Sequence, residues 1–188
     1  MNVTIDTELY RADAPLRWGC VQQFLPRPSL QWCDWLLDPG SLTRRLQALS
    51  NGDFHVQVLD ERWMRGNPAH LGIFAERYRS RMMWSRRVLL CGGGEPWVAA
   101  HSLIPVDSLR GELRQLVKLR DRPLGGFLFK YPQLRRQLPQ VAPLAGHWGR
   151  RSMFYLREKP VLVAEFYLPA LMRAAGSLNA PLAGNCHD

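Results

Sequence analysis

One carboxylate interrupts a long apolar stretch near the C-terminal end of the chain. Glu165 stands between Val-Leu-Val-Ala (161–164) and Phe-Tyr-Leu (166–168). These segments are apolar at both odd- and even-numbered positions, and so on both faces of a strand. Such a run is typical of a central strand covered on both faces, so we expect Glu165 to be buried. A buried carboxylate must be paired, hydrogen-bonded or protonated, because an isolated charge there is strongly unfavourable. Glu165 is therefore either a structural ion-pair partner of an arginine, or an acid that handles a proton or a hydroxyl in an apolar pocket.

Two adjacent arginines lie within a second apolar stretch. Arg86 and Arg87 follow Met-Met-Trp-Ser and precede Val-Leu-Leu-Cys, a composition typical of a strand. Because side chains alternate along a strand, Arg86 shares a face with Val88 and Arg87 shares one with Leu89, so one arginine is expected to point inward. If this is Arg86, its guanidinium can bind a carboxylate through two hydrogen bonds in an apolar pocket. The alternative is a pair of surface arginines.

Other polar residues give weaker signals. His101 lies in the stretch that would pair with the strand of Arg86, where it is either a ligand contact or a hydrogen-bonded structural residue. The cluster Trp-Gly-Arg-Arg-Ser at 148–152 is interpreted as solvated side chains. The cysteines show neither a Cys-x-x-Cys pair nor a histidine spacing suited to zinc, so we expect no metal site and a cytoplasmic protein with free thiols. They are Cys20, Cys33, Cys91 and Cys186.

The elements that must position these residues follow from hydrophobic periodicity and capping residues. Ser29 and Ser41 each precede apolar residues at helical spacing and predict two short helices, which end near 38–40 and 51–52. Strands are expected at 54–61, 78–91, 95–105, 147–157 and 160–168, with turns at Gly-Gly-Gly (92–94) and Glu-Lys (158–159). Further helices are expected from 107 or 108, from 122 and at 169–176, with a weaker one at 69–76, whereas 132–143 is expected to be irregular.

Strands paired through hairpins, with helices between them, predict a single α+β domain built on an antiparallel β-sheet. The 188 residues, 46% of them apolar, suffice for one core. We expect an N-terminal arm at 1–28, the domain at 29–175 and a frayed tail at 176–188. The formal charge of +9 would suit a nucleic-acid partner, but the arginines are dispersed and form no basic tail. We expect neither a nucleic-acid partner nor membrane insertion, because no signal peptide and no apolar run of about 18 residues is present.

Six motifs, in this order, resemble those of the chorismate pyruvate-lyase family, whose members form 4-hydroxybenzoate for ubiquinone synthesis. Each motif is weak alone, but their order and spacing match along most of residues 29–170. They are Trp-Leu-Leu-Asp-Pro-Gly-Ser-Leu-Thr (35–43), Leu-Leu-Cys-Gly-Gly-Gly-Glu-Pro-Trp-Val (89–98), Ser-Leu-Ile-Pro (102–105), Arg-Pro-Leu-Gly (122–125), Trp-Gly-Arg-Arg-Ser (148–152) and Val-Ala-Glu-Phe-Tyr-Leu-Pro (163–169).

The resemblance implies a monomeric α+β domain with helical flaps over a buried ligand site, and a lyase that needs no metal or organic cofactor. Carried over by position, the arginine that binds the ligand carboxylate is Arg86, and the acid beside the ligand hydroxyl is Glu165. Leu124 forms a wall of the site, and Leu42 takes a ligand-contacting position that is often Met in the family. The implied substrate is chorismate, and the implied products are pyruvate and 4-hydroxybenzoate.

Two positions depart from the family pattern. Arg87 replaces a glutamate, and His101 replaces an arginine that could assist the second carboxylate of chorismate or the exit of product. A histidine would do so only when protonated. These departures keep open an alternative function, a non-catalytic domain of the same fold that binds an aromatic acid. Against it, the chain shows no helix-turn-helix module to report ligand binding.

Overall fold

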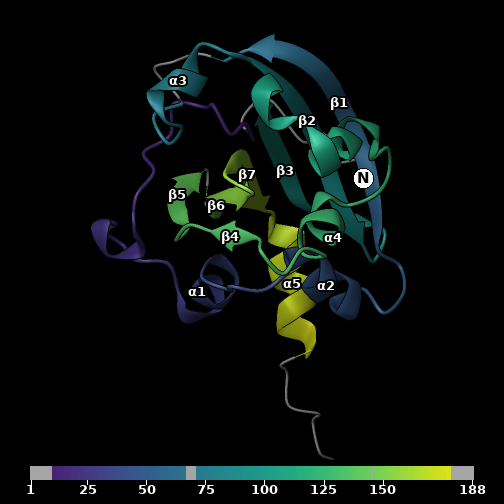
Figure 1. Ribbon diagram of the computed structural model, residues 1–188. Helices are drawn as coiled ribbons and strands as arrows, with labels where there is room; N and C mark the ends of the chain where they lie inside the picture. The colour runs from purple at the N-terminus through teal and green to yellow at the C-terminus, as the bar shows by residue number, and fades with distance from the viewer. Residues whose placement is uncertain (1–9, 67–70, 145, 179–188) are drawn as a thin grey trace, which may run out of the picture.

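The computed structural model describes residues 10–66, 71–144 and 146–178, and its centre is one antiparallel β-sheet (Figure 1). The strands lie in the order β1-β2-β3-β7-β6-β4, and β5 also pairs with β6. The predicted α+β class with an antiparallel sheet is confirmed. The strands are β1 (His55–Arg65), β2 (Met82–Gly92), β3 (Glu95–Pro105), β4 (Arg135–Arg136), β5 (Gln140–Leu144), β6 (His147–Leu156) and β7 (Lys159–Tyr167).

Short helices surround the sheet. The predicted caps are present, since the side chains of Ser29 and Ser41 accept hydrogen bonds from the backbone N–H groups of Trp32 and Arg44. The α-helices are α1 (Leu30–Leu36), α2 (Leu42–Leu49), α3 (Glu76–Arg79), α4 (Leu124–Leu128) and α5 (Pro169–Leu178), and the 3₁₀ helices are η2 (Val21–Gln23), η3 (Val106–Ser108) and η4 (Gly111–Lys118). No helix of the described segments is long and apolar enough to cross a membrane.

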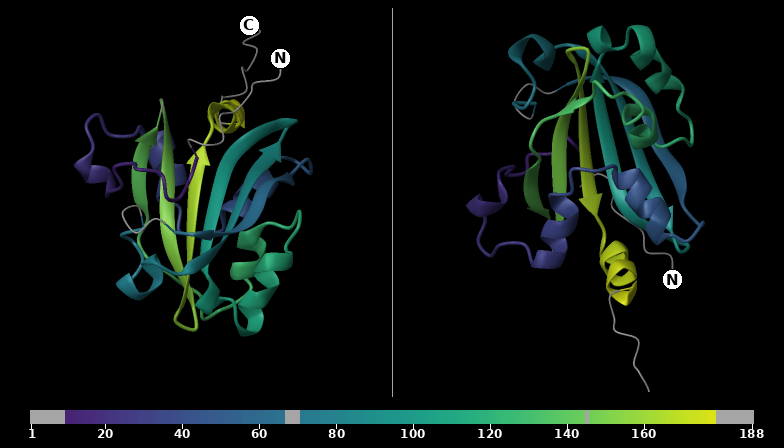
Figure 2. Two further views of the ribbon diagram at one scale, coloured as in Figure 1. Left: turned by 90° about the horizontal axis from the view of Figure 1, so that it is seen from above. Right: turned by 60° about the horizontal axis from the view of Figure 1, so that its bottom comes forward.

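Both faces of the sheet are covered, which explains the two-sided apolar runs of its central strands. On one face, α1, α2 and α4 pack over β2, β3, β7 and β6; on the other, part of the N-terminal stretch crosses the strands (Figure 2). Ala12 of that stretch is fully buried, and Gly19 forms a β-bridge with Val141. The face under α1, α2 and α4 is called the helix face below, and the other is called the arm face.

Several elements differ from the sequence prediction. The strand expected at 54–61 extends to Arg65, although its apolar alternation ends at Val58, because β2 is long enough to pair with it as far as Met82. The stretch 132–143 was expected to be irregular, but it contains β4 and part of β5, which pair with β6. The helix expected from 107 or 108 is instead the pair of 3₁₀ helices η3 and η4. The expected tail lies mostly outside the described residues.

Candidate functional site

The register of the sheet brings Arg86 and Glu165 to the same face. Arg86 on β2 lies opposite Ser102 on β3, and Ala100, two residues earlier on β3, lies opposite Glu165 on β7. Residues directly opposite one another in antiparallel strands point to the same face, as do residues two apart in one strand. Both side chains therefore point to the helix face, where they line one cavity.

This cavity is small and mostly apolar. Its volume is about 40 Å³, measured as the space open to the centre of a water molecule, so the gap between the lining atoms is wider than this figure. Its polar lining comes chiefly from three arginines and one glutamate, and its apolar lining comes from strands β2, β3, β6 and β7 and from the starts of α2 and α4. The charged residues are Arg86, Arg136, Arg150 and Glu165, and the apolar ones include Leu42, Val88, Ala100, Leu124, Phe154 and Val163.

Arg86 lines the cavity and is only 2% exposed. Its Nε donates to Glu61 Oε1 at 2.7 Å, and its Nη2 donates to the backbone carbonyl oxygens of Arg120 and Arg122 at 2.5 and 3.1 Å. Burial lowers the pKa of Arg86, and the Glu61 carboxylate acts in the opposite direction. The guanidinium is thus held in a fixed orientation, and its hydrogen bonds within the described residues leave Nη1 available to a ligand.

Glu165 is ion-paired at a different point of the same cavity. The Nε atom of Arg150 donates to Glu165 Oε2 at 2.6 Å, and the two side chains are 1% and 13% exposed. Arg150 Nη1 also donates to the carbonyl oxygens of Trp35 and Asp38, each at 3.0 Å. Although burial acts to lower the pKa of Arg150, the Glu165 carboxylate raises it above its usual value. The two interpretations of Glu165 are therefore not exclusive, because it has an arginine partner and also borders the cavity.

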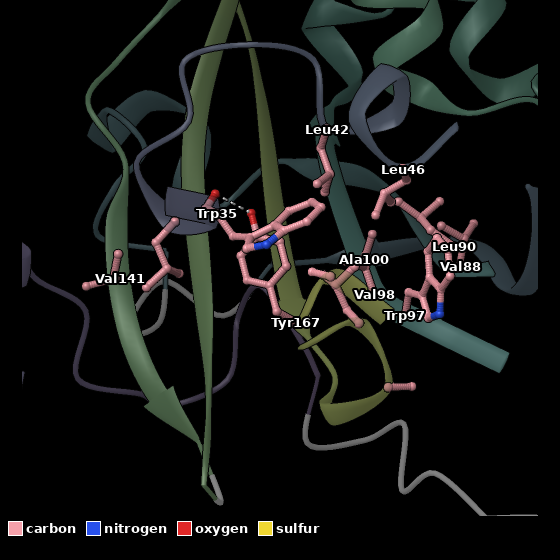
Figure 3. Close-up of a cluster of buried hydrophobic side chains, with 14 of the residues drawn as sticks. Trp35, Leu42, Leu46, Val88, Leu90, Trp97, Val98, Ala100, Val141 and Tyr167 are labelled. Atoms are coloured by element: carbon pink, nitrogen blue, oxygen red, sulfur yellow. Dashed lines mark hydrogen bonds between the residues drawn. The ribbon is translucent and has the colours of Figure 1, made fainter. Parts of the chain in front are cut away.

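Helix α1 is fixed to the sheet beside this ion pair. Tyr167 is fully buried, and its hydroxyl donates to the carbonyl oxygen of Trp35 at 3.1 Å, the bond drawn dashed in Figure 3. Burial raises the pKa of Tyr167, so its hydroxyl remains a donor. The same figure shows Leu46 of α2 next to Val88 and Leu90 of β2, and Leu42 nearer to Trp35; all five belong to one apolar cluster.

Leu42 and Leu124 occupy equivalent positions at the first residues of α2 and α4. The first N–H groups of a helix have no acceptor within the helix. At α2 the Ser41 side chain accepts from one of them, the Arg44 N–H, whereas α4 has no side-chain cap. The two helix starts lie in close contact, because a Cβ added at Gly125 would come within 2.7 Å of Thr43 Oγ1. The structure therefore brings Arg86, Glu165, Leu42 and Leu124 together.

His101 does not line this cavity, so the structure does not place it where it was expected to contact a ligand. It lies opposite Arg87 on β2 and Ala164 on β7, so it points to the arm face. Its Nδ1 accepts from the Ala12 N–H at 2.8 Å, and its Nε2 lies 2.9 Å from Ser85 Oγ. Burial lowers the pKa of His101 to about 3, so the ring is neutral at physiological pH. His101 is a hydrogen-bonded core residue.

Two cavity residues were missed in the sequence. Arg150 was assigned to a solvated cluster, yet it is the direct cross-strand partner of Glu165. Arg136 lies in a segment that was expected to be irregular, where no periodicity indicated a direction for its side chain. Arg150 could be placed opposite Glu165 only with the correct position of the hairpin turn, because the turn sets which residue of β6 pairs with Glu165. Within the described residues, no group of three or more His, Cys, Asp or Glu side chains is arranged to hold a metal.

Comparisons with known proteins identify a family. The sequence pattern of a family described as chorismate lyase matches residues 17–176. A chorismate pyruvate-lyase of Proteus mirabilis is 39% identical over 139 residues, which cover 72% of this chain and 79% of the relative. A chorismate pyruvate-lyase of Escherichia coli (strain UMN026) is 36% identical over 148 residues, which cover 78% of this chain and 87% of the relative.

Solved structures give weaker similarities. A GntR-family transcriptional regulator from Bacillus cereus superimposes with a TM-score of 0.43 and 11% identity over 63% of this chain and 93% of its own. The ligand-binding domain of a GntR-family regulator from Bordetella bronchiseptica gives a TM-score of 0.44 and 14% identity over 63% of this chain and 84% of its own. The sequence relatives are thus the informative matches.

Proposed function

Because this chain belongs to the chorismate lyase family, its reaction is the elimination of pyruvate from chorismate, and we propose that the cavity between Arg86 and Glu165 is where the reaction takes place. The observation that carries this proposal is that the buried Arg86 guanidinium and the Glu165 carboxylate line a single, mostly apolar cavity. Chorismate and 4-hydroxybenzoate both carry a ring carboxylate with a hydroxyl at the opposite ring position. The carboxylate suits the Arg86 cation, the hydroxyl suits the Glu165 carboxylate as hydrogen-bond acceptor, and the ring suits the apolar lining between them.

In this proposal the ring carboxylate of chorismate binds to Nη1 of Arg86. The backbone N–H groups at the starts of α2 and α4 are further donors, and the side chains of Leu42 and Leu124 contact the ring faces. The hydroxyl at C4 donates a hydrogen bond to the carboxylate of Glu165, whose Oε2 is already bonded to Arg150. These contacts fix the orientation of the ring, which is the main task in a reaction driven by aromatisation.

The reaction breaks the C3–O bond and the C4–H bond, and the electron pair of the C4–H bond completes the aromatic ring. The enolpyruvyl group leaves with the C3–O electron pair and gains a proton on its methylene carbon, so that it departs as pyruvate. The C4 hydrogen is either taken by Glu165 or transferred within the substrate to the methylene carbon. The structure favours the second route, because protonation of Glu165 would leave the buried Arg150 cation without its counter-charge, a cost of roughly 3–5 kcal/mol.

Two experiments test this function. Purified protein incubated with chorismate alone should form 4-hydroxybenzoate, followed by its ultraviolet absorbance, in equal amount to pyruvate. Binding of 4-hydroxybenzoate without any turnover would favour the alternative of a non-catalytic binding domain. With chorismate deuterated at C4, internal transfer places the deuterium in the methyl group of pyruvate, whereas complete loss of deuterium to solvent would assign proton removal to Glu165 or to water.

We further propose that the protein acts as a monomer in the cytoplasm. Among the described residues, Cys20, Cys33 and Cys91 are free thiols, as is usual in a reducing compartment. All the residues assigned to the cavity come from one chain, so the site does not require a second copy. Sedimentation of the purified protein should give a mass near 21.6 kDa, and a dimer at micromolar concentration would contradict the proposed monomer.

A further inference from the structure

Arg136 is the one arginine of the cavity that the proposed reaction has not used. It lies on β4, at the edge of the sheet, and its side chain borders the cavity. Its Nε donates to Ser152 Oγ at 3.0 Å, and its Nη1 donates to the carbonyl oxygen of Asp38 at 3.0 Å. Its Nη2 is buried and has no hydrogen-bond partner among the described residues. A buried charged donor without an acceptor is costly, so this nitrogen is well suited to an oxygen of a bound ligand.

The balance of charges around the cavity also favours an anionic ligand group at Arg136. Arg86 is paired with Glu61, and Arg150 is paired with Glu165. Arg136 has no carboxylate partner within the described part of the chain, and burial and the neighbouring Arg150 cation both lower its pKa. A guanidinium nevertheless stays protonated in proteins. Of the three arginines that line the cavity, Arg136 is therefore the one whose charge no paired carboxylate neutralises, which favours an anionic ligand group beside it.

The position of Arg136 relative to Glu165 follows from a shared acceptor. The carbonyl oxygen of Asp38 accepts hydrogen bonds from Nη1 of Arg136 and from Nη1 of Arg150, each at 3.0 Å. Arg150 Nε is bonded to Glu165, and the Glu165 carboxylate also acts to raise the pKa of Arg136, so both guanidiniums lie in the vicinity of that carboxylate. The Arg136 guanidinium also lies 5.2 Å from the centre of the Phe154 ring, which limits its movement. Arg136 is thus an oriented cation close to Glu165.

We infer that Arg136 binds the second carboxylate of the substrate, the one carried by the enolpyruvyl group. This inference rests on the proposed function, which places the C4 hydroxyl at Glu165 and the ring carboxylate at Arg86. The enolpyruvyl ether is attached at C3, next to the C4 hydroxyl, so its carboxylate must lie near Glu165, where Arg136 stands. The aromatic product lacks this second carboxylate. Arg136 therefore distinguishes the dianionic substrate from the monoanionic product.

Equilibrium binding of two stable ligands separates this role from a structural one. The first ligand is 4-hydroxybenzoate, and the second is 3-(carboxymethoxy)-4-hydroxybenzoate, which carries an ether-linked carboxylate beside the hydroxyl. Calorimetric titration of Arg136→Gln should show a loss of roughly 10- to 100-fold in affinity for the second ligand and a change of less than about threefold for the first. Arg135→Gln is the matched control, because Arg135 is the adjacent residue and is 64% exposed, so it removes the same net charge without touching the cavity.

Steady-state kinetics give a second test of the role of Arg136. In Arg136→Gln the KM for chorismate should rise roughly 10- to 100-fold, while the inhibition constant of 4-hydroxybenzoate should stay within about threefold of the unsubstituted protein. An equal loss of affinity for both ligands would show that Arg136 only holds the Asp38 carbonyl and the cavity wall, and unchanged affinity for both would show that it binds nothing. Either result overturns the inference.

Folding and function are checked independently. If Arg136→Gln does not fold, Arg136→Lys decides the question: it keeps one cationic donor and should lose roughly three- to tenfold for the dicarboxylate alone. Absence of turnover in the unsubstituted protein would refute the proposed function, whereas the two-ligand titration would still show whether Arg136 receives a second carboxylate.

Discussion

Replacement of Arg86 by alanine tests the central contact of the proposed site. The substitution removes one of the three cations of the cavity, and the ligand carboxylate then loses a charge-assisted hydrogen bond in a desolvated site. One such bond is worth roughly 1.5–3 kcal/mol, and truncation of one partner of a buried charge pair costs roughly 2–5 kcal/mol. A loss of about 2–4 kcal/mol is therefore expected, which corresponds to a loss of roughly 30- to 1,000-fold in affinity for 4-hydroxybenzoate.

Other contacts of Arg86 determine which control is needed. The alanine variant also frees Glu61, which is 24% exposed and can be hydrated, and it removes a donor from the carbonyl oxygens of Arg120 and Arg122. Some loss of stability is therefore expected, and thermal unfolding must show that the variant is folded at the assay temperature. Arg87→Ala is the matched control, because Arg87 is the next residue of β2, carries the same charge and lies on the arm face.

The assay is calorimetric titration of 4-hydroxybenzoate, followed by kcat/KM for chorismate. Arg87→Ala should bind the product within about threefold of the unsubstituted protein, since electrostatic effects across the sheet are weak for a residue outside the cavity. Arg86→Lys should fall between the two, because one ammonium cannot serve both Glu61 and the ligand. A folded Arg86→Ala protein with unchanged affinity for 4-hydroxybenzoate would refute the assignment of Arg86 to the ligand carboxylate.

Three further predictions concern pH, packing and product release. The pKa of His101 falls from an ordinary 6.5 to about 3 on folding, so only the unfolded state gains a proton between these values. The free energy of unfolding should therefore fall by roughly 2–3 kcal/mol from pH 7 to pH 4.5. In His101→Asn, the decrease measured by urea unfolding over the same pH range should be smaller by this amount. Gly125→Ala should separate α4 from Thr43 and weaken 4-hydroxybenzoate binding by roughly 1–3 kcal/mol, whereas Gly126→Ala, whose added Cβ would lie 3.5 Å from Pro123, should be neutral in the same titration. Product should bind with a micromolar dissociation constant and inhibit turnover, and an inhibition constant in the millimolar range would contradict slow release from a closed cavity.

Much of the sheet could be predicted from local patterns. The strands β2, β3, β6 and β7 have apolar residues at consecutive positions, so their approximate bounds follow from composition and from the turn residues between them. Short turns pair β2 with β3 and β6 with β7, whereas the pairing of β3 with β7 has no local signal. The caps at Ser29 and Ser41 are equally local. Strands β4 and β5 could not be predicted, because what identifies them as strands is their pairing with β6. Their formation depends on tertiary context rather than on their own periodicity.

The partner of Glu165 illustrates how a small error in a turn becomes a large error at a site. The expected turn at 158–159 would place Ser152 opposite Glu165. The observed turn is at Arg157 and Glu158, both of which have positive φ angles, of 48° and 62°. Leu156 then pairs with Lys159, and Arg150 lies opposite Glu165. Because neither turn residue is a glycine, the sequence contained no clear signal for this conformation.

The orientation of Arg86 could not be settled from alternation alone. The expectation that one of Arg86 and Arg87 points inward assumes that the other face of β2 is open to solvent. In the structure both faces are covered, and the two side chains are 2% and 11% exposed. The resemblance to a known family was needed to select Arg86, and the register of β2 with β3 then places it on the helix face with Glu165.

The arginines of the cavity also explain how it is closed. Arg86 donates to carbonyl groups of the segment before α4, while Arg136 and Arg150 donate to the carbonyl of Asp38, just before α2. These two segments lead directly to Leu124 and Leu42, the residues that border the cavity at the helix starts. The guanidiniums that contact ligand anions in our proposals are thus also the groups that hold the covering helices onto the sheet. Movement of either segment must break hydrogen bonds to these guanidiniums, so ligand exchange and opening of the cavity are coupled through the same side chains.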